Sequence, residues 1–178
     1  MFLPLPQVGI ISPMNDKNIE LIEAVKNDGV NRARALLEAG GDANATDEEG
    51  RPLLLLVVKA GSSRQMAELL LESGADLFWT TEEGVGLLDE AVERKRLDLA
   101  ELFIDRGLDP AQTRRKSGMT ALMLAACFEH LEMMELLYER GADLYAVDQM
   151  GFSAADFARK LRKPRSQKWI EEKMENPF

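Results

Sequence analysis

The sequence predicts an all-α protein, a solenoid of stacked helix–turn–helix units with protruding β-hairpin-type loops. Two sets of evenly spaced glycines and a recurring helical pattern carry this prediction. The first set stands where each unit is expected to end, at Gly41, Gly74, Gly107 and Gly141, and the second set lies in polar loops, at Gly50, Gly84, Gly118 and Gly151. Both sets keep the same period, about 33 residues from one glycine to the next. Units that repeat with such a period bury their apolar faces only against neighbouring units.

Each unit has the same internal order. A polar loop precedes a short apolar, alanine-rich run, and a second run with helical spacing follows. In the clearest copy the first run covers 120–127, and Leu131, Met134 and Leu137 of the second run fall on one stripe of a helix. This second helix is expected to stop at Gly141, since a glycine readily takes the left-handed conformation that ends a helix.

The clearest copy resembles the ankyrin repeat. Its matching segments are Thr120-Ala-Leu-Met-Leu-Ala-Ala126, His130 and Gly141-Ala-Asp143. The family's pattern opens the first helix with Thr-Pro-Leu-His, has Gly-His at the turn between the helices, and ends with Gly-Ala-Asp. This copy departs from the pattern at three positions: Ala121 replaces proline, Met123 replaces histidine, and Glu129 replaces the turn glycine.

The other copies are weaker, and together with this one they cover residues 18–163. The expected units are 18–46, which is the N-terminal cap, and then 47–80, 81–114, 115–147 and 148–163. The second unit has an extra residue near Gly61, the third has Gly86 in the threonine position, and Ser153 in the last can cap its helix. An extended, apolar arm is expected at 1–17 and a C-terminal capping helix at 164–178, where Pro164 suits the first turn.

The composition limits the function classes. The net charge is −9, with −13 on residues 1–158 and +4 on residues 159–178. An acidic body disfavours nucleic-acid binding and favours a basic partner. One cysteine excludes an internal disulfide framework, and no apolar run approaches the ~20 residues of a membrane span. We therefore expect a cytoplasmic protein that is monomeric on its own.

The sequence offers few groups for catalysis. The resemblance implies that His130, the sole histidine, bonds backbone in the adjacent loop. Cys127 lies three residues away, but no third residue is available to orient a base. Zinc needs about four Cys or His ligands, and no phosphate-binding glycine loop is present. We expect no cofactor, no metal, no small-molecule substrate and no enzymatic activity. An accessory enzyme that uses Cys127 and His130 is the alternative.

The resemblance implies that a partner protein binds to the loop tips and to the first, inner helix of each unit. The expected binding residues are a basic third tip (Arg114, Arg115 and Lys116), apolar neighbours (Met119, Phe128, Met150 and Phe152) and acidic tips that set the orientation (Glu48, Glu49, Glu82 and Glu83). Such a protein could be an adaptor, or an inhibitor of the immunity type.

Three features keep a second interpretation. Met119 and Phe152 could instead pack between adjacent hairpins. Trp79 either fills the space left by Gly84 and Gly86 or anchors a partner. The basic run 159–168 either covers the open end of the stack or associates with nucleic acid or a membrane surface.

Overall fold

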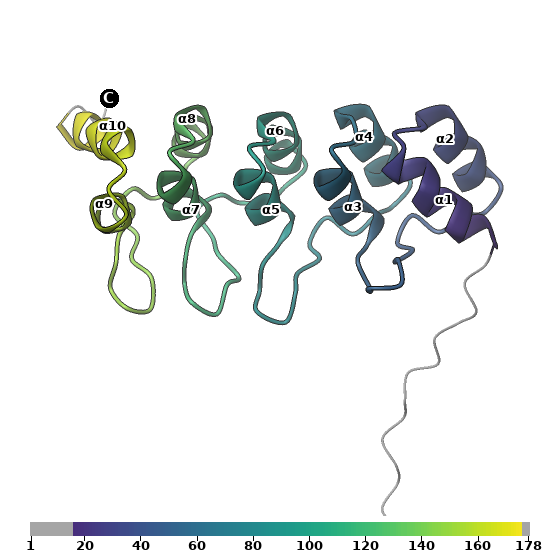
Figure 1. Cartoon of the computed structure of the whole chain (residues 1–178), viewed down its shortest axis with the longest axis horizontal. Helices are drawn as coiled ribbons and strands as arrows, with labels where there is room; N and C mark the ends of the chain where they lie inside the picture. The colour runs from purple at the N-terminus through teal and green to yellow at the C-terminus, as the bar shows by residue number, and fades with distance from the viewer. Residues whose placement is uncertain (1–15, 176–178) are drawn as a thin grey trace, which may run out of the picture.

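The computed structural model describes residues 16–175, and within them ten α-helices stack as five antiparallel pairs in one row (Figure 1). The inner helices are α1 (Asp16–Lys26), α3 (Leu53–Ala60), α5 (Leu87–Glu93), α7 (Ala121–Phe128) and α9 (Ala154–Lys160). The outer helices are α2 (Val30–Glu38), α4 (Arg64–Glu72), α6 (Leu97–Asp105), α8 (Leu131–Glu139) and α10 (Pro164–Glu175). The expected all-α solenoid is confirmed. Residues 1–15 of the predicted arm and residues 176–178 lie outside the described part of the chain.

The inner helices are apolar almost all round because each lies between two inner neighbours and the outer layer. Residues 53–58 of α3 are at most 3% exposed, and residues 121–126 of α7 at most 5%. The outer helices instead show one apolar stripe, as in α4, where Met66 and Leu70 are buried while Glu72 is exposed. The core is therefore a continuous layer along the stack and has no single centre.

The turn between the two helices of a pair requires a residue in the left-handed region. That residue is Asp28, Gly61, Lys95, Glu129 or Arg162 in successive pairs, with φ between 54° and 77°. A left-handed residue other than glycine costs about 1–2 kcal/mol. Two of these side chains offset the cost by capping the next unit, since Asp28 accepts from the backbone N–H of Ser63 and Glu129 from that of Arg165. The glycine of the family pattern is therefore replaceable here.

The ends of the outer helices correct the register expected for the first unit. Gly40, with φ of +93°, takes the left-handed position, followed by Gly74, Gly107 and Gly141 in the later units. The even period of the pattern is kept when Gly40 replaces Gly41 as its first member. Gly41 lies outside the left-handed region and has another reason to be glycine, because a Cβ there would lie 2.9 Å from the carbonyl oxygen of Leu36.

Ion pairs connect the outer helices along the stack. Arg64 of α4 contacts Glu101 of α6 at 3.0 Å, and Arg140 after α8 contacts both Glu101 and Asp105. These side chains are between 32% and 46% exposed, so each pair contributes at most about 1 kcal/mol. Their value lies in fixing the register of one outer helix against the next.

The last helix packs on α7, α8 and α9 and covers the C-terminal end of the stack (Figure 1). Its Ile170 is buried, Ser166 donates to the carbonyl of Ala126, and Trp169 donates to Glu135 of α8 at 2.8 Å. Lys173 also pairs with Glu135, which raises the pKa of the lysine and lowers that of the carboxyl. No helix in residues 16–175 has the length and apolarity of a membrane span.

Candidate functional site

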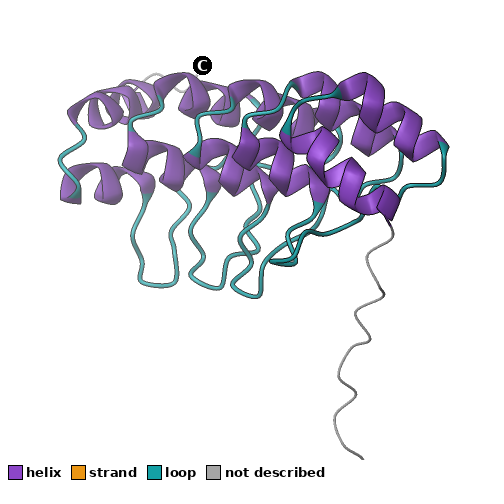
Figure 2. Ribbon diagram, turned by 45° about the vertical axis from the view of Figure 1, so that its right-hand side comes forward, coloured by secondary structure: helices purple, strands orange, loops and turns teal. Residues whose placement is uncertain are grey.

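Four loops project from the inner layer of helices, and the surface between these loops and the inner helices is called the groove below (Figure 2). The tips of the loops are residues 46–52, 80–86, 113–120 and 147–153. Short bridges close three of them, between Thr46 and Pro52, Thr80 and Gly86, and Val147 and Ser153. At the third tip the hydroxyl of Thr113 instead donates to the carbonyl of Met119 at 2.7 Å.

The first tip is organised by a carboxylate and carries exposed acidic groups. Asp47 accepts from the backbone N–H groups of Glu49 and Arg51 and pairs with the Arg51 side chain at 2.6 Å. Burial acts to raise the pKa of Asp47, but these hydrogen bonds outweigh it and lower the pKa. Glu48 and Glu49 are exposed beside α1, where they line the N-terminal part of the groove with Glu23.

The second and third tips bind each other. Lys116 contacts Glu83 through its side chain at 3.3 Å, and its backbone N–H donates to the carbonyl of Glu83 at 3.1 Å. The backbone N–H of Gln149 likewise donates to the carbonyl of Ser117 at 2.9 Å. Backbone hydrogen bonds therefore join the second, third and fourth tips into one row. Glu82 is exposed at this row.

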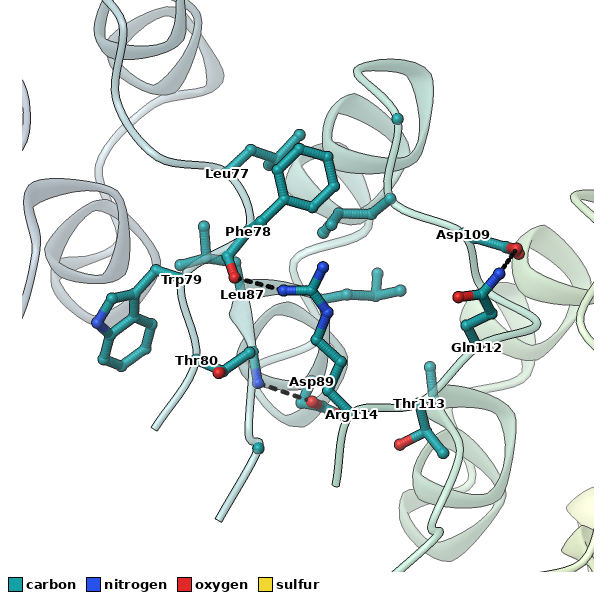
Figure 3. A pocket seen from close by; sticks show the side chains of 16 residues that line it. Leu77, Phe78, Trp79, Thr80, Leu87, Asp89, Asp109, Gln112, Thr113 and Arg114 are labelled. Carbon is teal, nitrogen blue, oxygen red and sulfur yellow. Dashed lines mark hydrogen bonds between the residues drawn. The ribbon is translucent and has the colours of Figure 1, made fainter. Parts of the chain in front are cut away.

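Gly84 shows how closely the second and third tips approach. A Cβ at Gly84 would lie 1.9 Å from the carbonyl oxygen of Arg114. The space beside this glycine is thus filled by the backbone of the third tip. Trp79 does not fill it, since Figure 3 shows its indole turned away from Arg114, and the side chain is half-buried against the core.

The three basic residues of the third tip do not share one surface. Arg115 pairs with Asp89 of α5 at 3.0 Å, and both side chains are nearly buried, at 15% and 14% exposure. Burial is the main reason that the pKa of Asp89 is raised. Arg114 turns the other way, donates to the carbonyl of Phe78 at 2.8 Å and places its guanidinium 5.4 Å from the Phe78 ring centre. Only Lys116 remains at the tip.

The apolar residues of the site differ in exposure. Met150 at the fourth tip is 77% exposed and Phe128 at the end of α7 is 43% exposed. Leu161, which holds the Phe128 position in the next unit, is 48% exposed. Met119 is half-buried against the core, and Phe152 contacts the Phe157 ring with 6.0 Å between centroids. The C-terminal half of the groove thus combines exposed apolar side chains with an apolar base.

A recess lies between the second and third loops, on the side where Arg114 points (Figure 3). Its volume is about 240 Å³. The residues that line it come from the loop 77–80, the start of α5, the loop 107–114 and Ala121. Figure 3 shows Phe78 and Arg114 on one side of the recess and Asp109 with Gln112 on the opposite side.

His130 and Cys127 have structural surroundings. The Nδ1 atom of His130 lies 2.9 Å from the carbonyl oxygen of Val92, at the end of α5 and not in a loop as the resemblance implied. Its ring also stacks on Phe128. Burial raises the pKa of the Cys127 thiol, which lowers the fraction of reactive thiolate. Residues 16–175 contain no cluster of three His, Cys, Asp or Glu side chains that could hold a metal ion.

The recess was not predicted from the sequence, although a signal for it exists. The segment from Gly107 to Gly118 is longer by a single residue than the corresponding segments of the other units, such as Gly74 to Gly84. This insertion lengthens the third loop. Phe78 also stands where the preceding loop has Asn44, so an apolar ring replaces a hydrogen-bonding side chain.

Comparisons with known proteins agree with this geometry. A family model described as ankyrin repeats in three copies matches residues 21–114 and 90–148. A curated protein of Treponema pallidum (strain Nichols), named as a putative ankyrin repeat-containing protein, is 29% identical over 143 residues. The match covers 80% of this chain and 48% of that protein, so the chain spans about half the length of this relative.

Proposed function

Because the chain belongs to the ankyrin repeat family, whose repeats are generally protein–protein interaction modules, we propose that it recognises a partner protein through the groove and is not an enzyme. The observation that carries the proposal is the exposure of Met150 and Phe128 in the C-terminal half of the groove. Methionine and aromatic side chains are enriched at protein interfaces, where a few such residues supply most of the binding energy.

The charge of the groove supports a polarity for the partner. Glu48, Glu49 and Glu82 are exposed at the first two tips, whereas the fourth tip presents Met150. A partner with a basic segment followed by an apolar one would match both halves. Charge at the rim mainly accelerates and orients association, while the apolar contacts provide affinity.

The row of tips makes the groove a preformed surface. Backbone hydrogen bonds from Lys116 to Glu83 and from Gln149 to Ser117 fix the spacing of three tips before a partner arrives. A surface that is already ordered loses less conformational entropy on binding. An inhibitor or immunity-type role would use this property, since such proteins must bind tightly without refolding.

The test is binding of the partner that co-purifies with the chain from its source cells. The double substitution Phe128→Ser and Met150→Ser should weaken that binding at least tenfold, because truncated interface anchors cost more than about 1 kcal/mol each. Tyr145→Ser is the matched control, since Tyr145 is 65% exposed in the same loop as Met150 but follows the end of α8. Equal affinity of the double variant and the parent chain would exclude the groove.

A further inference from the structure

The recess between the second and third loops exists because the repeat is broken there in two ways. Between the first and second loops, Asn44 donates to the carbonyl of Gly74 and accepts from the backbone N–H of Asp76, which ties these loops together. Phe78 occupies the equivalent position one unit later and cannot form this bridge. The inserted residue between Gly107 and Gly118 adds length to the opposite wall.

The walls of the recess suit a flat apolar ring. Leu77, Phe78, Leu87 and Leu108 contribute apolar surface, and Leu77 and Leu87 are buried in the core beneath it. The volume is about 240 Å³. In another protein, an apolar cavity of about 150 Å³ binds benzene. The recess therefore has room for one six-membered ring and a short polar substituent.

Arg114 supplies a cation at the edge of this recess. Its guanidinium makes one hydrogen bond, to the carbonyl of Phe78, and has no carboxylate partner within residues 16–175. The two carboxylates that line the recess are already engaged: Asp89 by Arg115 and the N–H of Gly86, and Asp109 by Gln112 and the N–H of Ala111. A guanidinium presents several N–H donors in a planar fork that matches a carboxylate.

We propose that this recess binds an aromatic ring that carries a carboxylate, with the ring beside Phe78 and Leu108 and the carboxylate on Arg114. A free aromatic acid and the C-terminal phenylalanine of a protein both present this chemistry. The inference goes beyond recognition in the groove. Phe128 and Met150, which test the groove, do not line the recess, so either site can fail without the other.

The first experiment is a titration of the isotope-labelled chain with 3-phenylpropionate, followed by nuclear magnetic resonance. The amide signals of Phe78, Leu108 and Gln112 should shift and those of Tyr145 should not. The dissociation constant should fall in the millimolar range, as expected for so small a ligand. The neutral 3-phenylpropionamide should bind at least tenfold more weakly, because a hydrogen bond to a charged group is lost.

Two variants and a matched control test the assigned residues. Arg114→Met should weaken binding of 3-phenylpropionate at least tenfold, and Phe78→Ser should weaken it severalfold, with circular dichroism unchanged in both. Arg34→Met is the control, since Arg34 is another exposed arginine without an ion pair in residues 16–175, and it should leave binding unchanged. Absence of shifts at the recess, or equal binding of the amide and the acid, would overturn the proposal.

A further arm separates the two sources of the ligand. A short peptide with a free C-terminal phenylalanine is compared with the same peptide as its C-terminal amide. Tighter binding of the free-ended peptide than of 3-phenylpropionate identifies a protein chain end as the natural source. Binding of 3-phenylpropionate that is equal to or tighter than that of the peptide identifies a small aromatic acid. Equal binding of the two peptides contradicts the role of Arg114.

Discussion

The contact between the second and third tips predicts a large difference between two glycine substitutions that look alike in sequence. Gly50 and Gly84 are the same position of successive units, with φ of +75° and +79°. A Cβ on Gly50 would meet no atom within 4 Å, whereas a Cβ on Gly84 would lie 1.9 Å from the carbonyl oxygen of Arg114. Gly50→Ala therefore measures the backbone cost alone, and Gly84→Ala adds the collision.

The magnitudes follow from these distances. An alanine in the left-handed region costs about 1–2 kcal/mol, and the stiffer unfolded chain returns about 0.4–1 kcal/mol, so Gly50→Ala should destabilise by about 1 kcal/mol. At Gly84 the third tip must retreat by about 1.5 Å to restore an ordinary contact of 3.4 Å. Overpacking of this kind costs about 1–3 kcal/mol. Loss of the hydrogen bond from Lys116 to Glu83 adds about 1 kcal/mol. Gly84→Ala should thus destabilise by about 3–5 kcal/mol.

The assay is urea unfolding followed by circular dichroism, combined with hydrogen exchange of the Lys116 amide. Gly84→Ala should lower the unfolding midpoint much more than Gly50→Ala and should remove the protection of the Lys116 amide. A free-energy difference between the two variants below about 0.5 kcal/mol, with protection of this amide intact, would refute the close approach of the tips.

Three further predictions concern single residues. Lys95→Gly should stabilise the chain by about 0.5–1 kcal/mol in urea unfolding, because Lys95 is left-handed, whereas Glu129→Gly should gain nothing since it also loses the acceptor for the next helix. Asn44→Ala should cost about 1–2 kcal/mol in the same assay, since it breaks two hydrogen bonds between loops. Glu135→Gln should destabilise the chain at neutral pH, because Lys173 holds the pKa of Glu135 below its usual 4.5. The unfolded chain takes up this proton first, so the difference from the parent should be full above pH 4.5 and disappear as the pH falls through the folded pKa.

Much of the fold could be predicted because the repeat states it several times. The left-handed glycines at Gly74, Gly107 and Gly141 lie where the pattern placed them. The first unit misled because two glycines stand together, and only the backbone shows that Gly40 ends the helix while Gly41 avoids a contact with Leu36. A local pattern cannot distinguish these two requirements for glycine.

The candidate site was less predictable because side-chain partners come from neighbouring units. The sequence places Arg114, Arg115 and Lys116 side by side, but the structure directs them to Phe78, Asp89 and Glu83 respectively. Each of these partners belongs to the preceding unit of the array, far from the third tip along the chain. Adjacent residues of an extended segment point in opposite directions, so a run of three like charges need not make one basic surface.

The same reasoning bears on where specificity can reside in this protein. The positions that hold the tips together, such as Gly84 and the Arg115–Asp89 pair, are constrained by their neighbours and cannot change without moving the row. Met150 and the exposed glutamates Glu48 and Glu82 project from that surface, and their side chains are not part of the hydrogen bonds that join the tips. Substitutions at Met150 should therefore alter partner affinity with little effect on stability, whereas substitutions at Arg115 should alter both. A binding surface whose frame and contacts are separable in this way can be retargeted without refolding the array.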